Sequence, residues 1–183
     1  MYATLLASAL DTISSEPLVL VGHSHGGRVA TVLAAEHPER VRALVLTGVP
    51  LVRLSSPRRS PWGYRVVREL HRRGVISESR MEAARQKYGS SDYRNSSGLL
   101  REILVTLVNE SYEKALEHVT SPTTLLWGEN DSEVPLSVAH RAMEILTSST
   151  SVTLDIVADT GHLLPTERPV ELAAHVLRMV RGS

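Results

Sequence analysis

The chain has 183 residues, no cysteine, and twenty acidic side chains against twenty basic ones. This length suits one domain, or one domain with an insert, and the lack of cysteine excludes a disulfide framework and a thiolate zinc site. A net charge of zero gives no global attraction for nucleic acid, and no apolar run approaches the roughly 18 residues of a membrane span.

The first expected element is an amphipathic helix, because apolar residues recur at helical spacing from Leu5 to Ile13. This segment lacks the basic start of a secretory signal peptide, so we expect a cytoplasmic protein. Residues 18–22, LVLVG, are apolar on both faces and predict a buried strand. A helix is expected to follow over residues 26–36.

The rest of the chain alternates strands with helices, except for one interval. Apolar runs predict strands at 41–48, 123–128 and 151–157, and periodic segments predict helices at 136–146 and 170–180. This alternation predicts an α/β fold: a mostly parallel sheet of about four strands with flanking helices. Residues 51–120 contain no convincing strand. We therefore expect a core of residues 1–50 and 121–183 and a helical insert of residues 51–120.

A sharp turn joins the first expected strand to its helix, in the sequence Gly22-His23-Ser24-His25-Gly26. This G-x-S-x-G pattern between a strand and a helix is typical of a nucleophile elbow. The turn would expose the Ser24 hydroxyl at the carboxyl end of the sheet. Glycines at positions 22 and 26 would remove side chains where strand and helix crowd each other.

A serine hydroxyl needs an oriented base to act as a nucleophile, and two later loops offer the missing groups. Asp131 follows the strand 123–128, and His162 follows the strand 151–157. Parallel strands would bring both loops to the same edge of the sheet as Ser24. Three other carboxylates compete for the role of the acid, and the position of Asp131 after its strand favours it. The competitors are Glu129, Glu133 and Asp159.

The segments GHSHGG, WGENDSEVP and DTGHLLPTERP resemble the motifs of the α/β-hydrolase superfamily, and the resemblance extends over almost the whole chain. It implies that Ser24 is the nucleophile, His162 the general base and acid, and Asp131 the orienting acid. The backbone N–H of His25 would be the first oxyanion donor. The substrate would be a small molecule with an ester, thioester or similar carbonyl group, and no cofactor or metal is implied.

The same resemblance identifies the helical insert with the family's cap. Residues 51–89 carry ten Lys or Arg against three Glu. We interpret this surplus as a solvated face, and the alternative is attraction of an anionic substrate or surface.

The resemblance covers the carboxyl-terminal part of the family's fold, without its amino-terminal strands. Only sixteen residues precede Pro17, and they predict a helix. We therefore expect the strand 18–22 to lie at an exposed sheet edge, which invites self-association. Two functions follow from the sequence: a serine hydrolase, or a catalytically silent hydrolase fragment that acts as a binding module.

Overall fold

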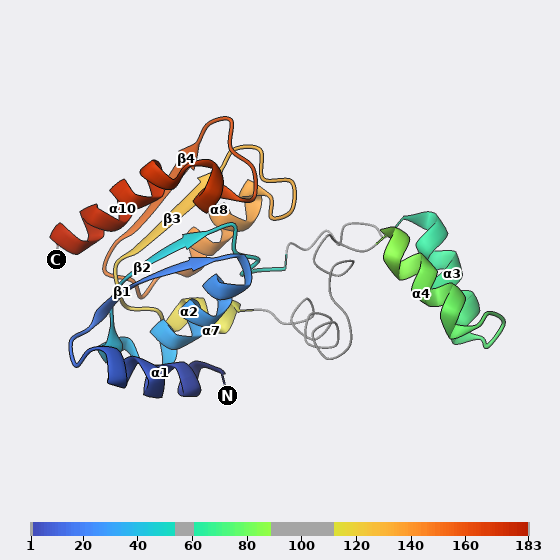
Figure 1. The fold of residues 1–183 in the computed structure, drawn as a ribbon, viewed down its shortest axis with the longest axis horizontal. Coiled ribbons are helices and arrows are strands. Elements are labelled where there is room, and N and C mark those ends of the chain that lie inside the picture. The colour runs from blue at the N-terminus through green and yellow to red at the C-terminus, as the bar shows by residue number, and fades with distance from the viewer. Residues whose placement is uncertain (1, 54–60, 89–111, 183) are drawn as a thin grey trace. The chain divides into compact units, whose positions relative to one another are not determined.

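The computed structural model describes residues 2–53, 61–88 and 112–182. The chain divides into two compact units, one of Met1–Leu54 with Ser111–Ser183 and the other of Ser55–Glu110. The first unit contains the sheet, and the second contains the helices α3 and α4 (Figure 1).

Four parallel strands form the sheet of the first unit, in the spatial order β1-β2-β3-β4. The strands are β1 (Leu18–His23), β2 (Val41–Thr47), β3 (Thr123–Gly128) and β4 (Val152–Val157). The expected α/β fold with a parallel sheet of about four strands is therefore confirmed. Because all four strands run the same way, the loops that follow them meet at one edge of the sheet.

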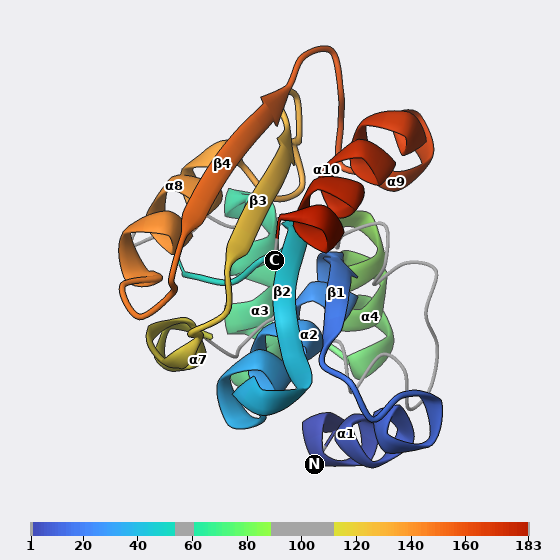
Figure 2. The same ribbon diagram turned by 90° about the vertical axis from the view of Figure 1, so that its left-hand side faces the viewer.

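Helices cover both faces of this sheet. The helices of this unit are α1 (Tyr2–Ile13), α2 (Ser24–Glu36), α7 (Glu113–His118), α8 (Leu136–Ile145), α9 (Leu164–Glu167) and α10 (Pro169–Arg181), with one 3₁₀ turn, η1 (Pro38–Arg40). Helix α10 lies on one face, and α2 and α8 lie on the other (Figure 2). Helix α1 packs on the outer side of α2, and α7 lies between α2 and α8.

The main core lies between the sheet and the α2–α8 face. Leu44, Leu46 and Leu125 alternate along β2 and β3 and are fully buried against Leu33 of α2. Burying one such side chain contributes about 1.5–3 kcal/mol relative to its exposure. Trp127 is also fully buried, and its indole Nε1–H donates to the Val134 carbonyl at 2.9 Å. This bond ties the loop after β3 to the core.

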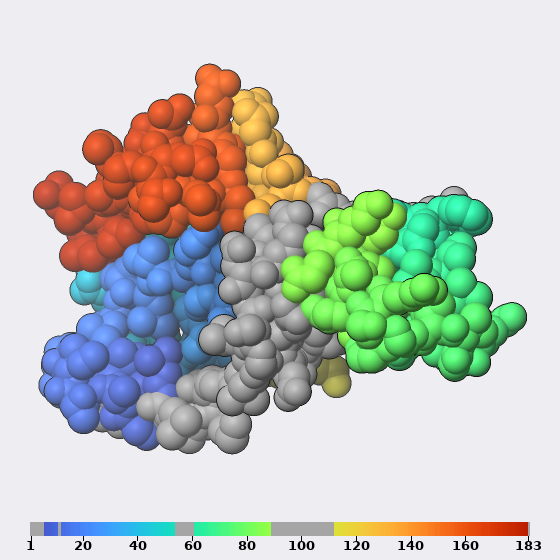
Figure 3. Space-filling model, turned by 45° about the vertical axis from the view of Figure 1, so that its right-hand side comes forward, coloured from blue at the N-terminus to red at the C-terminus, as the bar shows by residue number. Residues whose placement is uncertain are grey.

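The described residues of the second unit form a pair of packed helices, α3 (Trp62–Arg72) and α4 (Glu78–Tyr88), whose side chains form one block (Figure 3). Met81 and Ala84 are buried. Hydrogen bonds from Arg72 and Arg73 lower the pKa of Glu69 to about 2.

Helix α7 lies within the expected insert of residues 51–120, but it belongs to the first unit. Residues 54–60 and 89–111 of the expected helical insert lie outside the described residues, and the assignment of residues 51–120 as a cap stays a prediction.

Strand β1 forms one edge of the sheet, and in the described part of the chain no strand pairs with its outer side. Val21 of this strand is 46% exposed. We expect the chain to self-associate through this edge and Val21→Lys to shift the population toward monomer, because a charge on an edge strand opposes strand pairing. Sedimentation velocity measures both species.

Val75→Lys is the matched control, since Val75 is 65% exposed and lies in the turn between α3 and α4. This variant should sediment like the wild type. A monodisperse wild-type monomer, or association that Val21→Lys leaves unchanged, would contradict the prediction.

Candidate active site

The turn between β1 and α2 holds Ser24 in an unusual backbone conformation. Strand β1 ends at His23 and α2 begins at Ser24, so no residue separates the two elements. Ser24 has φ 48°, in the left-handed region that a residue with a side chain rarely adopts. Such strain costs on the order of 1–3 kcal/mol and clusters at functional sites. The helix starts two residues earlier than the sequence pattern indicated.

Two glycines make the close approach of β1 to α2 possible. A Cβ on Gly22 would lie 2.9 Å from the backbone N of Gly27 and closer still to its Cα. A Cβ on Gly27 would collide with the side chain of Val49. A Cβ on Gly26 would meet nothing within 4 Å. The expectation for Gly22 is confirmed, while that for Gly26 was wrong, because Gly27 is the residue that faces the strand.

The structure brings Ser24, His162 and Asp131 together at the carboxyl edge of the sheet. The Nε2 atom of His162 lies 3.3 Å from the Oγ of Ser24. The Nδ1 atom of the same ring lies 2.9 Å from the Oδ2 of Asp131. These are hydrogen-bond distances in a continuous chain from hydroxyl to imidazole to carboxylate, which is the arrangement that serine nucleophiles use.

The Asp131 carboxylate is held in place on both of its oxygens. Its Oδ1 accepts from the backbone N–H of Glu133 at 2.9 Å and of Val134 at 2.8 Å, and its Oδ2 faces His162. The side chain is 1% exposed. Burial by itself would raise the pKa of Asp131, but the hydrogen bonds from His162 and the two backbone N–H groups outweigh it and lower the pKa. The group is therefore ionised at neutral pH.

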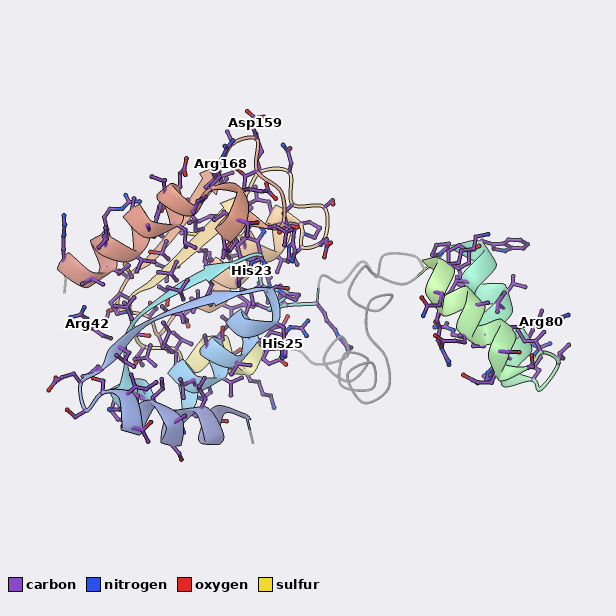
Figure 4. All side chains as sticks on the ribbon, viewed as in Figure 1. His23, His25, Arg42, Arg80, Asp159 and Arg168 are labelled. Atoms are coloured by element: carbon purple, nitrogen blue, oxygen red, sulfur yellow. The ribbon has the colours of Figure 1, made fainter. Side chains whose placement is uncertain are left out.

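The other candidate acids take different positions. Glu129 accepts from the backbone N–H of Asp159 at 3.4 Å, and the guanidinium of Arg168 contacts the Asp159 carbonyl at 3.5 Å. Figure 4 shows Asp159 and Arg168 in the loops beyond β4, away from His23 at the end of β1. Glu133 lies 3.8 Å from His162, but from Nε2 and not from Nδ1. Asp131 is thus the carboxylate that contacts Nδ1.

Sequence reasoning missed the contribution of Gly48, which follows β2. Gly48 has φ 58°, and a Cβ there would lie 3.0 Å from Nδ1 of His162 and 3.3 Å from Oδ2 of Asp131. A side chain at this position would therefore push into the imidazole–carboxylate contact. The signal in the sequence is a glycine directly after a predicted buried strand. That pattern does not identify His162 and Asp131 as its neighbours in the fold.

His23 also contributes more than the motif suggested. Its ring centroid lies 5.0 Å from that of His162, at an interplanar angle of 48°. Its Nδ1 lies 3.1 Å from the carbonyl oxygen of Thr47 at the end of β2. The His23 ring thus packs beside the His162 imidazole and limits its rotation.

The loops after β3 and β4 are tied to each other. The backbone N–H of Asn130 donates to the Thr160 carbonyl at 2.9 Å. A Cβ on Gly128 would lie 2.9 Å from the carbonyl carbon of Thr160, so only glycine allows this approach. The backbone N–H of Gly161 donates to the Glu167 carboxylate at 2.6 Å. These contacts fix the backbone just before His162.

His25 lies in the first turn of α2, so its backbone N–H is at the positive end of the helix dipole. Its side chain is exposed, near the carboxyl end of the sheet (Figure 4).

Among residues 2–53, 61–88 and 112–182, no group of three or more His, Asp or Glu could hold a metal ion. Nor is any helix in these ranges both long and apolar enough to cross a bilayer.

Comparison with known proteins gives one consistent family. Residues 1–169 match the family described as alpha/beta hydrolase fold. The chain is 32% identical to Lipase LipV of Mycobacterium tuberculosis over 195 residues, covering 92% of this chain and 70% of that protein. It is 26% identical to a 2-hydroxy-6-oxononadienedioate/2-hydroxy-6-oxononatrienedioate hydrolase of Burkholderia vietnamiensis, covering 99% of this chain and 68% of that protein.

A solved structure matches as well. The crystal structure of MGS-MChE2, an alpha/beta hydrolase enzyme from the metagenome of lagoon sediments at Mar Chica, Morocco, is similar with a TM-score of 0.64 and 23% identity. The match covers 99% of this chain and 69% of that one. At this identity the likeness concerns the fold alone.

The glycines at the elbow provide a matched pair for testing its packing. Gly22→Ala should destabilise the protein by about 1–3 kcal/mol, because its Cβ would meet the Gly27 backbone, which cannot rotate away. Gly26→Ala should be neutral or stabilising by up to about 1 kcal/mol, since the site is open and alanine favours helix. Urea unfolding of both variants measures the difference. Equal losses of stability would show that the approach at Gly22 is not the constraint.

Proposed function

The chain belongs to the alpha/beta hydrolase fold family, and on that premise we propose that it is a serine hydrolase in which Ser24, His162 and Asp131 carry the reaction. The observation that supports this most is the continuous chain of contacts, 3.3 Å from Ser24 Oγ to His162 Nε2 and 2.9 Å from His162 Nδ1 to Asp131 Oδ2. The strained backbone at Ser24 supports it too, because strain of this kind clusters at functional sites.

The proposed reaction is acyl transfer to water. Ser24 Oγ attacks the carbonyl carbon while His162 Nε2 takes the hydroxyl proton, and the same imidazole then protonates the leaving group. The backbone N–H of His25 is our candidate for stabilising the oxyanion, since it lies at the positive end of α2. Water activated by His162 then releases the acyl group and restores Ser24.

The proposed substrates are small molecules with an ester, thioester or similar carbonyl group. The names of the relatives leave the charge of the substrate open, since one is called a lipase and another acts on dioates, which are dianions. We also propose that residues 51–120 form a cap that selects the substrate. None of the three proposed catalytic residues lies in that interval.

The alternative is a catalytically silent chain that binds a partner, and a fluorophosphonate probe separates the two. An activated Ser24 should react covalently with the probe, and Ser24→Ala should abolish this labelling. The same variant should lower the rate of 4-nitrophenyl butyrate hydrolysis by about a thousandfold or more. Ser137→Ala, in the exposed first turn of α8, is the control and should behave like the wild type. Undiminished hydrolysis by Ser24→Ala would remove this serine from the mechanism.

The assignment of the acid has its own matched pair. Asp131→Asn should lower kcat by about a thousand- to ten-thousandfold, because an amide leaves the imidazole in the wrong tautomer. Asp159→Asn should have little effect, since asparagine tolerates the positive φ of 50° at that position and the side chain lies away from His23, whose ring packs beside that of His162. Steady-state kinetics on 4-nitrophenyl butyrate compares them. A larger loss in Asp159→Asn would reverse the assignment.

A further inference from the structure

We propose that Arg28 of α2 is a positioning residue that fixes the neck of the helical insert, and that it thereby governs the selection of the acyl group. The neck consists of Pro50, Leu51 and Tyr112. The inference rests on the proposed serine hydrolase function and its cap, and it concerns substrate selection by that same site. Its basis is a buried guanidinium that contacts both chain segments of the neck.

The neck joins the places where the chain leaves and re-enters the first unit. The chain passes to the second unit after Leu54 and returns at Ser111. Next to these crossings, the backbone N–H of Tyr112 donates to the Leu51 carbonyl at 3.0 Å. Leu51 is fully buried, and Tyr112 packs against the same core. The neck therefore belongs to the first unit, and it fixes both points of attachment of the insert.

Arg28 contacts both segments of the neck. Its Nε donates to the Pro50 carbonyl at 3.2 Å. Its guanidinium carbon lies 5.3 Å from the centre of the Tyr112 ring, within the range of cation–π attraction. The residue is 7% exposed, so its charge is largely removed from water, and these contacts help to offset that cost. A planar guanidinium can donate to one segment while it lies over the ring of the other, which an ammonium group matches only in part.

The position of Arg28 on α2 connects the neck to the nucleophile. Arg28 lies one helical turn after Ser24, on the helix that also carries the proposed oxyanion donor. Helix α7, which follows Tyr112 directly, packs on α2 as well. A shift of the neck is therefore a shift relative to the helix that presents Ser24.

The expected role of Arg28 is selection and not chemistry. The contacts of His162 with Ser24 and Asp131 come from the turn before α2 and from the loops after β3 and β4. The contacts of Arg28 with the neck lie on a different part of α2. If the insert selects the acyl group, a loosened neck leaves its attachment less defined, and discrimination between acyl chains of different length falls.

The first test measures the neck directly by amide hydrogen exchange in the full chain, followed by NMR, and it needs no activity. Arg28→Met removes the donor and the charge but keeps a long side chain, so the exchange rate of the Tyr112 N–H should rise about tenfold. The Asn130 N–H, which donates to the Thr160 carbonyl, should keep its rate. Arg28→Lys keeps the charge and should restore part of the protection.

The second test measures selection with 4-nitrophenyl acetate, butyrate and octanoate. In Arg28→Met the spread in kcat/KM among these esters should shrink about tenfold, mainly through KM, because a less defined site distinguishes chain length less well. The rate of fluorophosphonate labelling should stay within about twofold of the wild type, since the contacts of Ser24 are unchanged.

Arg42→Met is the matched control for both tests. Arg42 of β2 is exposed and donates to a backbone carbonyl at a similar distance, 3.2 Å to that of Val180. Val180 belongs to α10, on the face of the sheet opposite α2. Arg42→Met should therefore change neither the exchange of the Tyr112 N–H nor the spread among the esters.

The exchange results decide whether Arg28 holds the neck. An unchanged rate at Tyr112 in Arg28→Met would show that it does not. Equal rises at Tyr112 and Asn130 would reduce its role to general stability. Either result would overturn the proposal.

The kinetic results separate this proposal from the hydrolase function. If hydrolysis depends on Ser24 but Arg28→Met leaves the spread unchanged, or if the wild type shows no preference among the esters, the role in selection fails and the hydrolase function stands. If no ester is hydrolysed in a Ser24-dependent way, the proposed function fails and selection fails with it. The exchange at Tyr112 still shows in that case whether Arg28 holds the neck.

Discussion

The contact between Asp131 Oδ2 and His162 Nδ1, at 2.9 Å, is the interaction on which the candidate site depends. It joins the loops that follow β3 and β4, and it turns the other ring nitrogen toward Ser24. The carboxylate is available for this contact only because two backbone N–H groups hold its second oxygen. The space for the contact exists because Gly48 has no side chain there. Burial of the Asp131 side chain, which is 1% exposed, strengthens its hydrogen bonds.

The backbone of the sheet supplies the second constraint. Four parallel strands deliver their loops to one edge, and the turn at Ser24 projects its hydroxyl from that edge at φ 48°. A strained residue persists only where its surroundings hold it. Here β1 lies close to α2 because Gly22 and Gly27 have no side chains where the two elements meet. The fully buried residues of the neighbouring strand β2 belong to the core on which both elements pack. Packing energy from the core thereby stabilises an unfavourable backbone at the site.

Two carboxylates on the two nitrogens of one imidazole illustrate how environment separates residues of similar chemistry. Asp131 is buried, and both of its carboxylate oxygens are hydrogen-bonded, one of them to Nδ1 of the ring. Glu133, two residues later, is 43% exposed and lies beyond hydrogen-bond distance of Nε2. The same short loop thus contains two carboxylates that differ in burial and in their contacts with the imidazole.

The sequence by itself determined the order and type of the elements that build the site, because strand runs, the turn Gly22–Gly26 and the loops after each strand are local patterns. It also indicated Ser24, Asp131 and His162. It could not show that Gly27 rather than Gly26 meets the strand, that Gly48 lies over the imidazole, or that Glu133 faces Nε2. Those facts depend on distances between segments as far apart as Ser24 and His162, 138 residues along the chain. Only the packing of the sheet sets such distances, which is why the tertiary structure decided them.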